Sequence, residues 1–286
     1  MKYYIIIPVI FILIFCGCAS EPAYVNRDNQ KRTDISHAGH IIFIGFDGFG
    51  SKYIPKANMP NLKKMINEGS SCMDVYNILP PVSGPNWHSL FKGTPFDKQT
   101  ADNFPSIMTL FKNAGKDTVY FYEWHGMKSI SDADNIRSIR IKSDYESAVI
   151  ISEYIKENKP AFTSIVYNEP DLTGHKKCYG SKSYYKKLEL LDEFILLIRQ
   201  AAIDAEIYDE TVFIISSDHG GEMTGHYVNL KSIRKIPLVF FGKNIKQGHK
   251  ITATAGIFDI APTMAVIFGL DIPSEWTGAP VWEIFK

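Results

Sequence analysis

Six side chains of the types that bind divalent metal ions are spread along the 286-residue chain. They are three carboxylates and three imidazoles, namely Asp47, Asp171, His175, Asp218, His219 and His226. Oxygen and nitrogen ligands of this kind suit zinc or another divalent transition metal. Six ligands are too many for one tetrahedral ion and enough for two. Two ions about 3.5–4 Å apart can hold both the attacking and the leaving oxygen of a displacement at phosphorus.

Ser83 is the candidate nucleophile for such a displacement. It precedes Gly84 and Pro85 at the expected start of a helix, where serine is also among the best N-capping residues. Two features favour a catalytic role. Free backbone N–H groups at a helix start bind phosphate oxygens, and a metal ion can deprotonate a coordinated hydroxyl at neutral pH. Gly84 leaves space for a substrate beside the hydroxyl.

The elements around these residues must bring them together. Short apolar runs predict buried strands, and apolar residues at helical spacing predict helices between them. The expected strands are 41–46, 118–122, 162–167, 211–216 and 236–241, and the expected helices are 60–67, 85–91, 105–114, 144–157, 183–205 and 259–268. This alternation predicts an α/β protein, a three-layer α/β/α sandwich with a mainly parallel central sheet. Asp47, Asp171 and Asp218 each come just after an expected strand. Because ligands in such sheets sit beyond the carboxyl ends of the strands, we expect the six side chains to meet at one edge.

The same motifs resemble the alkaline phosphatase superfamily, most closely its type I phosphodiesterase / nucleotide pyrophosphatase branch. The resemblance spans roughly residues 40–286 and rests on short segments around the residues above. They are Phe46-Asp47-Gly48, Ser83-Gly84-Pro85-Asn86, Glu169-Pro170-Asp171 through Gly174-His175, Ser217-Asp218-His219-Gly220 and Gly225-His226. An alkaline phosphatase-like core is the fold that this resemblance implies.

The resemblance also implies how the residues divide. One ion would be held by Asp171, His175 and His226. The other would be held by Asp47, Asp218 and His219, with Ser83 as its fourth ligand and the covalent nucleophile. In the family, an asparagine some twenty positions after the nucleophile contacts a phosphoryl oxygen. Asn103 stands at that spacing, and Asn86 is the second candidate.

The expected function is a two-metal phosphoric ester hydrolase that acts on a small-molecule phosphate ester through a phosphoseryl intermediate, with two divalent ions, zinc above all. No arginine lies between Arg32 and Arg137 to clamp a dianionic monoester near the nucleophile. This favours a phosphodiesterase or nucleotide pyrophosphatase. The alternatives are a phosphomonoesterase, a sulfatase and a non-catalytic surface lipoprotein.

The N-terminal residues predict export. Residues 1–20 have a basic start, a short apolar run and small residues around Cys18, which is typical of a bacterial lipoprotein signal with a lipid attached to that cysteine. Residues 21–38 are polar and are expected to be a tether, and residues 39–286 the catalytic domain. The protein would then face the periplasm, or lie at the outer membrane or cell surface.

Composition bounds the remaining partners. The chain carries 31 lysines and arginines against 31 aspartates and glutamates, and this balance gives no reason to expect nucleic acid as a partner. Cys72 and Cys178 remain after the leader; the sequence leaves open whether they pair, and it leaves the oligomeric state unknown.

Overall fold

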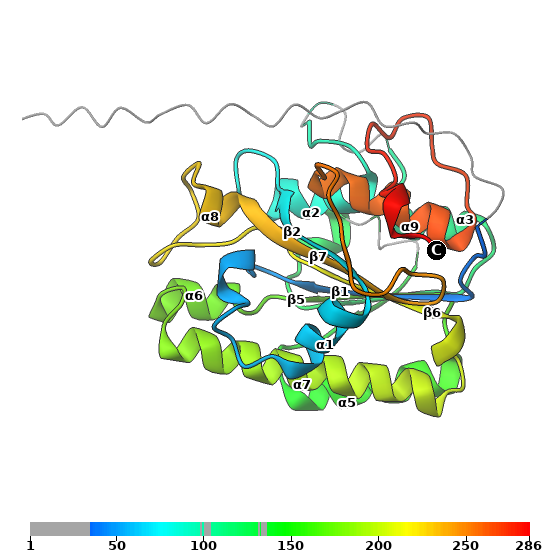
Figure 1. Ribbon diagram of the computed structural model, residues 1–286, viewed down its shortest axis with the longest axis horizontal. Helices are drawn as coiled ribbons and strands as arrows, with labels where there is room; N and C mark the ends of the chain where they lie inside the picture. The colour runs from blue at the N-terminus through cyan, green and yellow to red at the C-terminus, as the bar shows by residue number, and fades with distance from the viewer. Residues whose placement is uncertain (1–34, 98, 100–103, 131, 133–135) are drawn as a thin grey trace, which may run out of the picture.

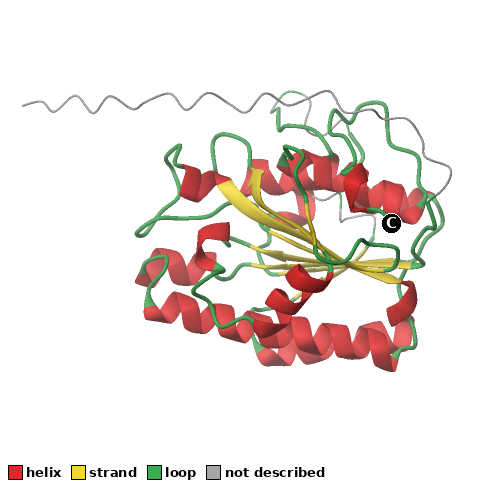
Figure 2. Ribbon diagram, in the orientation of Figure 1, coloured by secondary structure: helices red, strands yellow, loops and turns green. Residues whose placement is uncertain are grey.

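The fold is that of a computed structural model, which describes residues 35–97, 99, 104–130, 132 and 136–286. A single eight-stranded sheet runs through the molecule in the order β4-β3-β5-β1-β6-β7-β2-β8. Helices cover both of its faces (Figures 1 and 2). The strands are β1 (His40–Phe46), β2 (Ser70–Tyr76), β3 (Thr118–Tyr122), β4 (Arg137–Arg140), β5 (Phe162–Tyr167), β6 (Thr211–Ser216), β7 (Lys235–Gly242) and β8 (His249–Lys250). The predicted three-layer α/β/α sandwich is confirmed.

The helices form the two outer layers. One face of the sheet is covered by α1 (Pro60–Glu68), α5 (Tyr145–Asn158) and α7 (Lys182–Asp204), which lie below the sheet in Figure 1. The other face is covered by α2 (Ser83–Lys92), α3 (Ile107–Asn113) and α9 (Ile260–Phe268). The described residues also form the short α-helices α4 (Met127–Ile130), α6 (Asp171–Lys177) and α8 (Lys231–Arg234).

Strand β1 lies at the centre of the sheet and divides the core in two. Its side chains alternate between the faces, as the period of a strand requires. Ile41 and Phe43 join the cluster under α2 and α9, whereas Ile42, Ile44 and Phe46 join the cluster over α5 and α7. Burial on both sides explains why this strand is a continuous apolar run.

The sheet is mainly parallel, with one reversed strand. β1 pairs in parallel with β5 and β6, and β3 pairs in parallel with β4 and β5. β7 is antiparallel to both β6 and β2. The connection from β6 to β7 contains only the short helix α8, and not the long helix that usually crosses over between parallel strands.

The packed domain begins slightly earlier than expected. Ile35 and Ala38, at the end of the predicted tether, are buried in the core, and the Ala38 N–H donates to the Ile267 carbonyl. Cys18 and the predicted signal peptide lie outside the described residues. Within the described ranges, no helix is long and apolar enough to cross a membrane. Cys72 is buried, Cys178 is exposed, and both are free thiols.

Helix α2 packs against β1 through aromatic side chains, and at Gly45 the two elements are especially close. A Cβ atom at Gly45 would lie 2.5 Å from Cη2 of Trp87, so only glycine lets the indole pack flat on the strand. Trp87 is fully buried and stacks on Phe91 of the same helix, with the ring centroids 5.9 Å apart. This contact sets the distance between the start of α2 and the end of β1.

Gly45→Ala is therefore expected to lower the free energy of unfolding by about 1–3 kcal/mol, because the added methyl group overpacks a closed core. Urea denaturation with a two-state fit measures the change. Gly84→Ala is the matched control, since a Cβ atom there meets nothing within 4 Å, and it should be neutral or slightly stabilising. Equal stability of the two variants would show that Trp87 does not depend on Gly45.

Candidate active site

The three carboxylates lie at the carboxyl ends of three neighbouring strands. Asp47 follows β1, Asp171 begins α6 after β5, and Asp218 follows β6. The pairing of the strands places the three carboxylates side by side. Gly45 of β1 pairs with Ser216 of β6, and the Asp171 N–H donates to the Asp47 carbonyl at 3.0 Å. Gly48 makes this approach possible. Its φ is +75°, and a Cβ atom there would lie 2.8 Å from Cβ of Asp171.

Asp47, Asp218 and His219 form the first group of candidate metal ligands. One ligand atom from each lies within 4.8 Å of the others, and all three side chains are buried. His219 Nε2 is 3.2 Å from Asp218 Oδ2 and 3.6 Å from Asp47 Oδ1. The Asp218 carboxylate is held by the N–H groups of Gly48 and of His219, both of which donate to Oδ1.

Asp171, His175 and His226 form the second group. His175 Nε2 lies 3.3 Å from Asp171 Oδ2, and His226 Nε2 lies 3.8 Å from Asp171 Oδ1. The two groups are in contact, because the rings of His219 and His226 stack with centroids 3.8 Å apart. The structure thus brings all six predicted side chains to one edge of the sheet, in the two sets of three that the resemblance implied.

The three imidazoles share one tautomer. Each Nδ1 atom donates to a backbone carbonyl, at 2.8 Å from His175 to Thr224, 2.9 Å from His219 to Gly220 and 2.7 Å from His226 to Pro81. A carbonyl only accepts, so Nδ1 carries the proton and Nε2 presents a lone pair. This is the way in which metal-binding histidines are oriented by their outer partners.

The Nε2 lone pairs of these histidines face other hydrogen-bond acceptors. Their contacts show whether a cation would fit within each ligand group. His175 Nε2 is 3.1 Å from His226 Nε2. Asp218 Oδ2 is buried and has no hydrogen-bond partner among the described residues, although His219 Nε2 lies 3.2 Å away. Acceptors packed against acceptors repel each other, and a buried one without a partner is costly. A divalent cation within each group removes both penalties, so the residues present fit a metal ion in each.

Burial sets the protonation states of the first group. It raises the pKa of Asp47 well above the usual value, with the Asp218 and Asp171 charges adding to the effect. Burial likewise raises the pKa of Asp218 to about 7 and lowers the pKa of His219 to about 4. In the absence of a cation the group therefore favours neutral carboxyls and a neutral imidazole.

Ser83 lies at the edge of the first group. It is the first residue of α2, and its hydroxyl donates to Asp47 Oδ1 at 3.3 Å and lies 3.1 Å from His219 Nε2. The preceding Val82 makes no side-chain cap to the helix. The space beside Gly84 is open, as expected from the sequence.

Two aromatic side chains hold the ligands in place. Trp87 Nε1 donates to Asp47 Oδ2 at 3.1 Å, and the Tyr179 hydroxyl donates to Asp171 Oδ1. Neither bond follows from a pattern in the sequence. Trp124 and His125, which follow β3, are exposed.

The two asparagine candidates have different outcomes. Asn86 is fully buried, with its amide bonded to Ile78 N, Pro80 O and Val82 O. These bonds hold the loop that leads to Ser83, and a contact between Asn86 and substrate stays a prediction. Asn103 lies outside the described residues.

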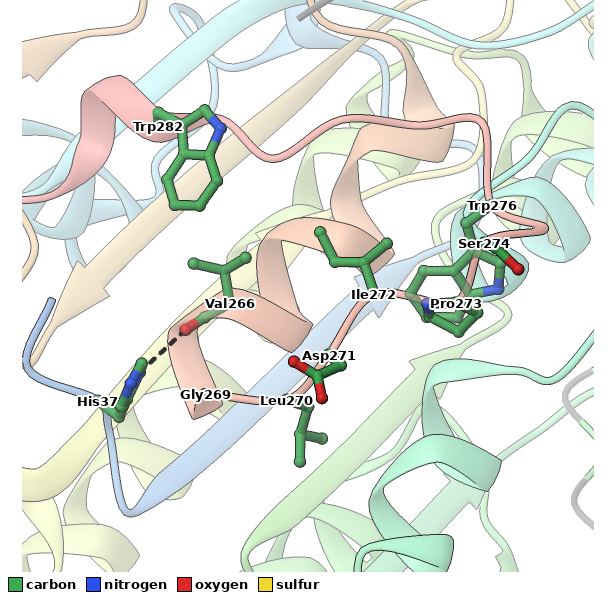
Figure 3. A pocket seen from close by; sticks show the side chains of 10 residues that line it. All are labelled: His37, Val266, Gly269, Leu270, Asp271, Ile272, Pro273, Ser274, Trp276 and Trp282. Atoms are coloured by element: carbon green, nitrogen blue, oxygen red, sulfur yellow. Dashed lines mark hydrogen bonds between the residues drawn. The ribbon is translucent and has the colours of Figure 1, made fainter. Parts of the chain in front are cut away.

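A separate pocket of about 300 Å³ lies far from the six ligands. It is formed beside the C-terminal end of α9 and includes His37, Leu270, Trp276 and Trp282 (Figure 3). His37 precedes β1, whereas Asp47 follows it, so the strand separates the pocket from the ligand groups by roughly 20 Å. The candidate chemistry therefore stays at the carboxyl edge of the sheet.

Sequence comparison with known proteins places the site in a family. The type I phosphodiesterase / nucleotide pyrophosphatase model matches residues 41–98, and the metalloenzyme superfamily model matches residues 113–272. The 2,3-bisphosphoglycerate-independent phosphoglycerate mutase of Salmonella paratyphi A is 24% identical over 280 residues, which are 91% of this chain and 50% of the relative. The bis(5'-adenosyl)-triphosphatase enpp4 of Mus musculus is 23% identical over 65% of this chain and 48% of its own length. The chain thus spans about half the length of these curated relatives.

Solved structures show the same fold. A 2-O GAG sulfatase superposes with a TM-score of 0.74 at 13% identity, covering 85% of this chain and 73% of the sulfatase. Murine ectonucleotide pyrophosphatase / phosphodiesterase 5, in complex with AMP, superposes with a TM-score of 0.67 at 13% identity, covering 88% of this chain and 100% of that chain. The superfamily model alone spans more than half of the 286 residues. The chain belongs to the alkaline phosphatase superfamily of metalloenzymes.

Proposed function

We propose that this protein is a two-metal phosphoric ester hydrolase in which Ser83 is the nucleophile. The position of the Ser83 hydroxyl carries the proposal, because it lies within 3.3 Å of both Asp47 Oδ1 and His219 Nε2. A hydroxyl beside one ligand group, with the second group stacked against it, is the arrangement that a displacement at phosphorus needs. We propose zinc for both groups, since carboxylate oxygen and imidazole nitrogen suit that ion.

The bound ions would lower the pKa of the nucleophilic hydroxyl and neutralise charge on the leaving oxygen. The protein's own side chains position the reacting groups. Asp47 accepts the Ser83 hydrogen bond and aims the oxygen, while Trp87 holds Asp47 in turn. In the first turn of α2, the N–H groups of Ser83 and Gly84 can donate to phosphoryl oxygens, since Pro85 has no N–H and the Asn86 N–H donates to the Val82 carbonyl. A P–O bond to Ser83 forms as the ester P–O bond breaks, and water then cleaves the phosphoseryl ester to restore the hydroxyl.

A diester is the proposed substrate class. A dianionic monoester is held best by a guanidinium group. The Arg137 guanidinium lies over the Tyr154 ring, and Arg140 donates to the Glu123 carbonyl, so both are engaged elsewhere. The experiment is a comparison of bis(nitrophenyl) phosphate with nitrophenyl phosphate on the metal-loaded protein. Faster monoester cleavage would favour a phosphomonoesterase, and cleavage of a sulfate ester alone would favour a sulfatase.

A lipid anchor at Cys18 and an exported location are part of the proposal. The leader composition supports them. Metabolic labelling with palmitate should mark the full chain and should fail to mark Cys18→Ser.

Ser83→Ala should lower diester turnover by about 10³-fold or more, because no free hydroxyl in the described part of the chain can replace it at the first ligand group. The Ser217 hydroxyl also lies 3.5 Å from Asp218 Oδ1, but it is fully buried, donates to the His219 carbonyl and accepts from the Phe49 N–H. The metal content should stay at that of the unchanged protein. Steady-state kinetics and metal analysis measure the two effects. Ser183→Ala, an exposed serine on α7, is the matched control and should leave both unchanged. Normal turnover by Ser83→Ala would exclude this residue as the nucleophile.

Zinc binding should release protons near pH 6. Asp218, whose pKa is raised to about 7, and Asp47, whose pKa is also raised well above its usual value by burial, must lose protons before they can coordinate. His219, whose pKa is lowered to about 4, is already neutral and releases none. The apparent affinity should therefore rise from pH 6 towards pH 8, with about one to two protons released at pH 6 and fewer at pH 8.

Titration calorimetry in buffers with different ionisation enthalpies counts these protons. Asp218→Asn is the informative variant, because it removes one titrating carboxyl and should reduce the proton release at pH 6. Affinity that is independent of pH, with no proton release in either protein, would contradict the buried-carboxyl account of the first group.

A further inference from the structure

The loop of residues 222–230, hereafter the apolar loop, carries an unusual set of exposed side chains. Met223 is 78% exposed and Tyr227 is 70% exposed, more than any other large hydrophobic side chain in the described part of the molecule. Val228 and Leu230 are exposed as well. Large apolar side chains gathered on a surface mark a site of contact with a partner or a membrane.

The apolar loop is built onto the active site. His226, one of the six candidate ligands, lies in its middle and is itself buried. The Tyr227 ring packs 4.7 Å from the His226 ring and 6.3 Å from the His175 ring, between centroids. Whatever covers the apolar loop is thus brought to the rim of the second ligand group.

A basic segment lies beside this loop. Residues 175–187, hereafter the basic segment, contain five lysines and no aspartate or glutamate, in a chain whose net charge is zero. Lys176, Lys177, Lys182 and Lys186 are exposed. The Tyr179 N–H donates to the Met223 carbonyl at 2.7 Å, which joins the basic segment to the apolar loop. In Figure 1 both lie at the end of the molecule that carries α6 and α8.

We propose that the apolar loop and the basic segment together form a surface that docks on an anionic lipid bilayer, and that the substrate is the phosphate ester of a lipid-like amphiphile. This proposal rests on the proposed hydrolase function for the identity of the reacting group. Exposed apolar side chains flanked by lysines are the combination that binds a membrane surface, since the former enter the boundary of the acyl chains and the latter attract anionic headgroups.

The arrangement also explains why the two features occur together. An apolar loop alone could bind any hydrophobic partner, and a lysine cluster alone could bind any anion. Here four exposed lysines come from α6 and the start of α7, and the turn between these helices is bonded to the apolar loop through the Tyr179 N–H and the Met223 carbonyl. A headgroup phosphate drawn to the lysines would therefore stand beside His175 and His226, close to the proposed chemistry.

The test uses the full chain with Cys16→Ser and Cys18→Ser, and an environment-sensitive fluorophore on Cys178. That thiol is exposed and adjoins the apolar loop, whereas Cys72 is buried. Vesicles of phosphatidylglycerol and phosphatidylcholine should shift the emission to the blue. The shift should shrink in pure phosphatidylcholine and in high salt, because the lysines contribute through charge.

Met223→Asn with Val228→Asn should abolish the shift, and asparagine suits the φ of 49° at position 223. Leu196→Asn with Ile203→Asn is the matched control, because these exposed side chains lie on α7 away from the loop. The loop variant should also lose about tenfold or more in kcat/KM for a phosphodiester embedded in vesicles, with no change for soluble bis(nitrophenyl) phosphate.

Absence of any vesicle-dependent shift, or equal shifts in the loop variant and its control, would overturn the docking surface while soluble turnover left the hydrolase intact. Efficient docking with no turnover of either ester would support the surface as a membrane contact. The same result would contradict both the amphiphilic substrate and the hydrolase function. Equal cleavage of the embedded ester by the loop variant and the unchanged protein would contradict the substrate assignment alone.

Discussion

Electrostatic repulsion at one edge of the sheet is the constraint on which the rest of this structure depends. Three carboxylates and three imidazole lone pairs are held within a few ångströms of one another, and most of them are buried. Such an arrangement is unfavourable for the bare protein, because charged and polar groups lose their hydration and gain no donor in return. Burial reduces part of this cost by raising the pKa of the Asp47 and Asp218 carboxyls and lowering the pKa of the His219 and His226 imidazoles. A divalent cation in each group would remove the remaining repulsion between the acceptors.

The fold provides the rigidity that this site requires. β5, β1 and β6 are adjacent and parallel, so their carboxyl ends present one acidic residue each. Two glycines allow the close approach of neighbouring elements at the site. Gly45 leaves room for the Trp87 indole, and Gly48 leaves room for Asp171. The buried indole then reaches the Asp47 carboxylate from the opposite layer. Core packing and ligand geometry are thus coupled through a single tryptophan, which positions α2 and with it the candidate nucleophile.

Much of this could be predicted from the sequence, because the informative signals are local. Continuous apolar runs identified β1, β5 and β6, and the residues that directly follow them supplied the ligands. The sequence does not predict β4, β8, α4, α6 and α8, which are short, nor β2, whose polar and apolar residues are mixed. The run of β7 is buried on both faces, so its pattern cannot distinguish an antiparallel strand from a parallel one. The Tyr179 bond to Asp171 depends on a loop that folds back after α6, which no sequence period encodes. The bonds of the Asn86 amide to the loop before Ser83 could not be predicted either, because the sequence does not show which way an amide near a nucleophile faces.

The central claim is that two cations occupy the two groups of three residues. Anomalous diffraction at the zinc absorption edge, from crystals of the purified full chain, tests it most directly. We expect two strong peaks, one bounded by Asp47, Asp218 and His219 and the other by Asp171, His175 and His226, each about 2.0–2.2 Å from its ligand atoms. Zinc-supplemented crystals with no peak at either group, or with the two groups separated in space, would contradict the account.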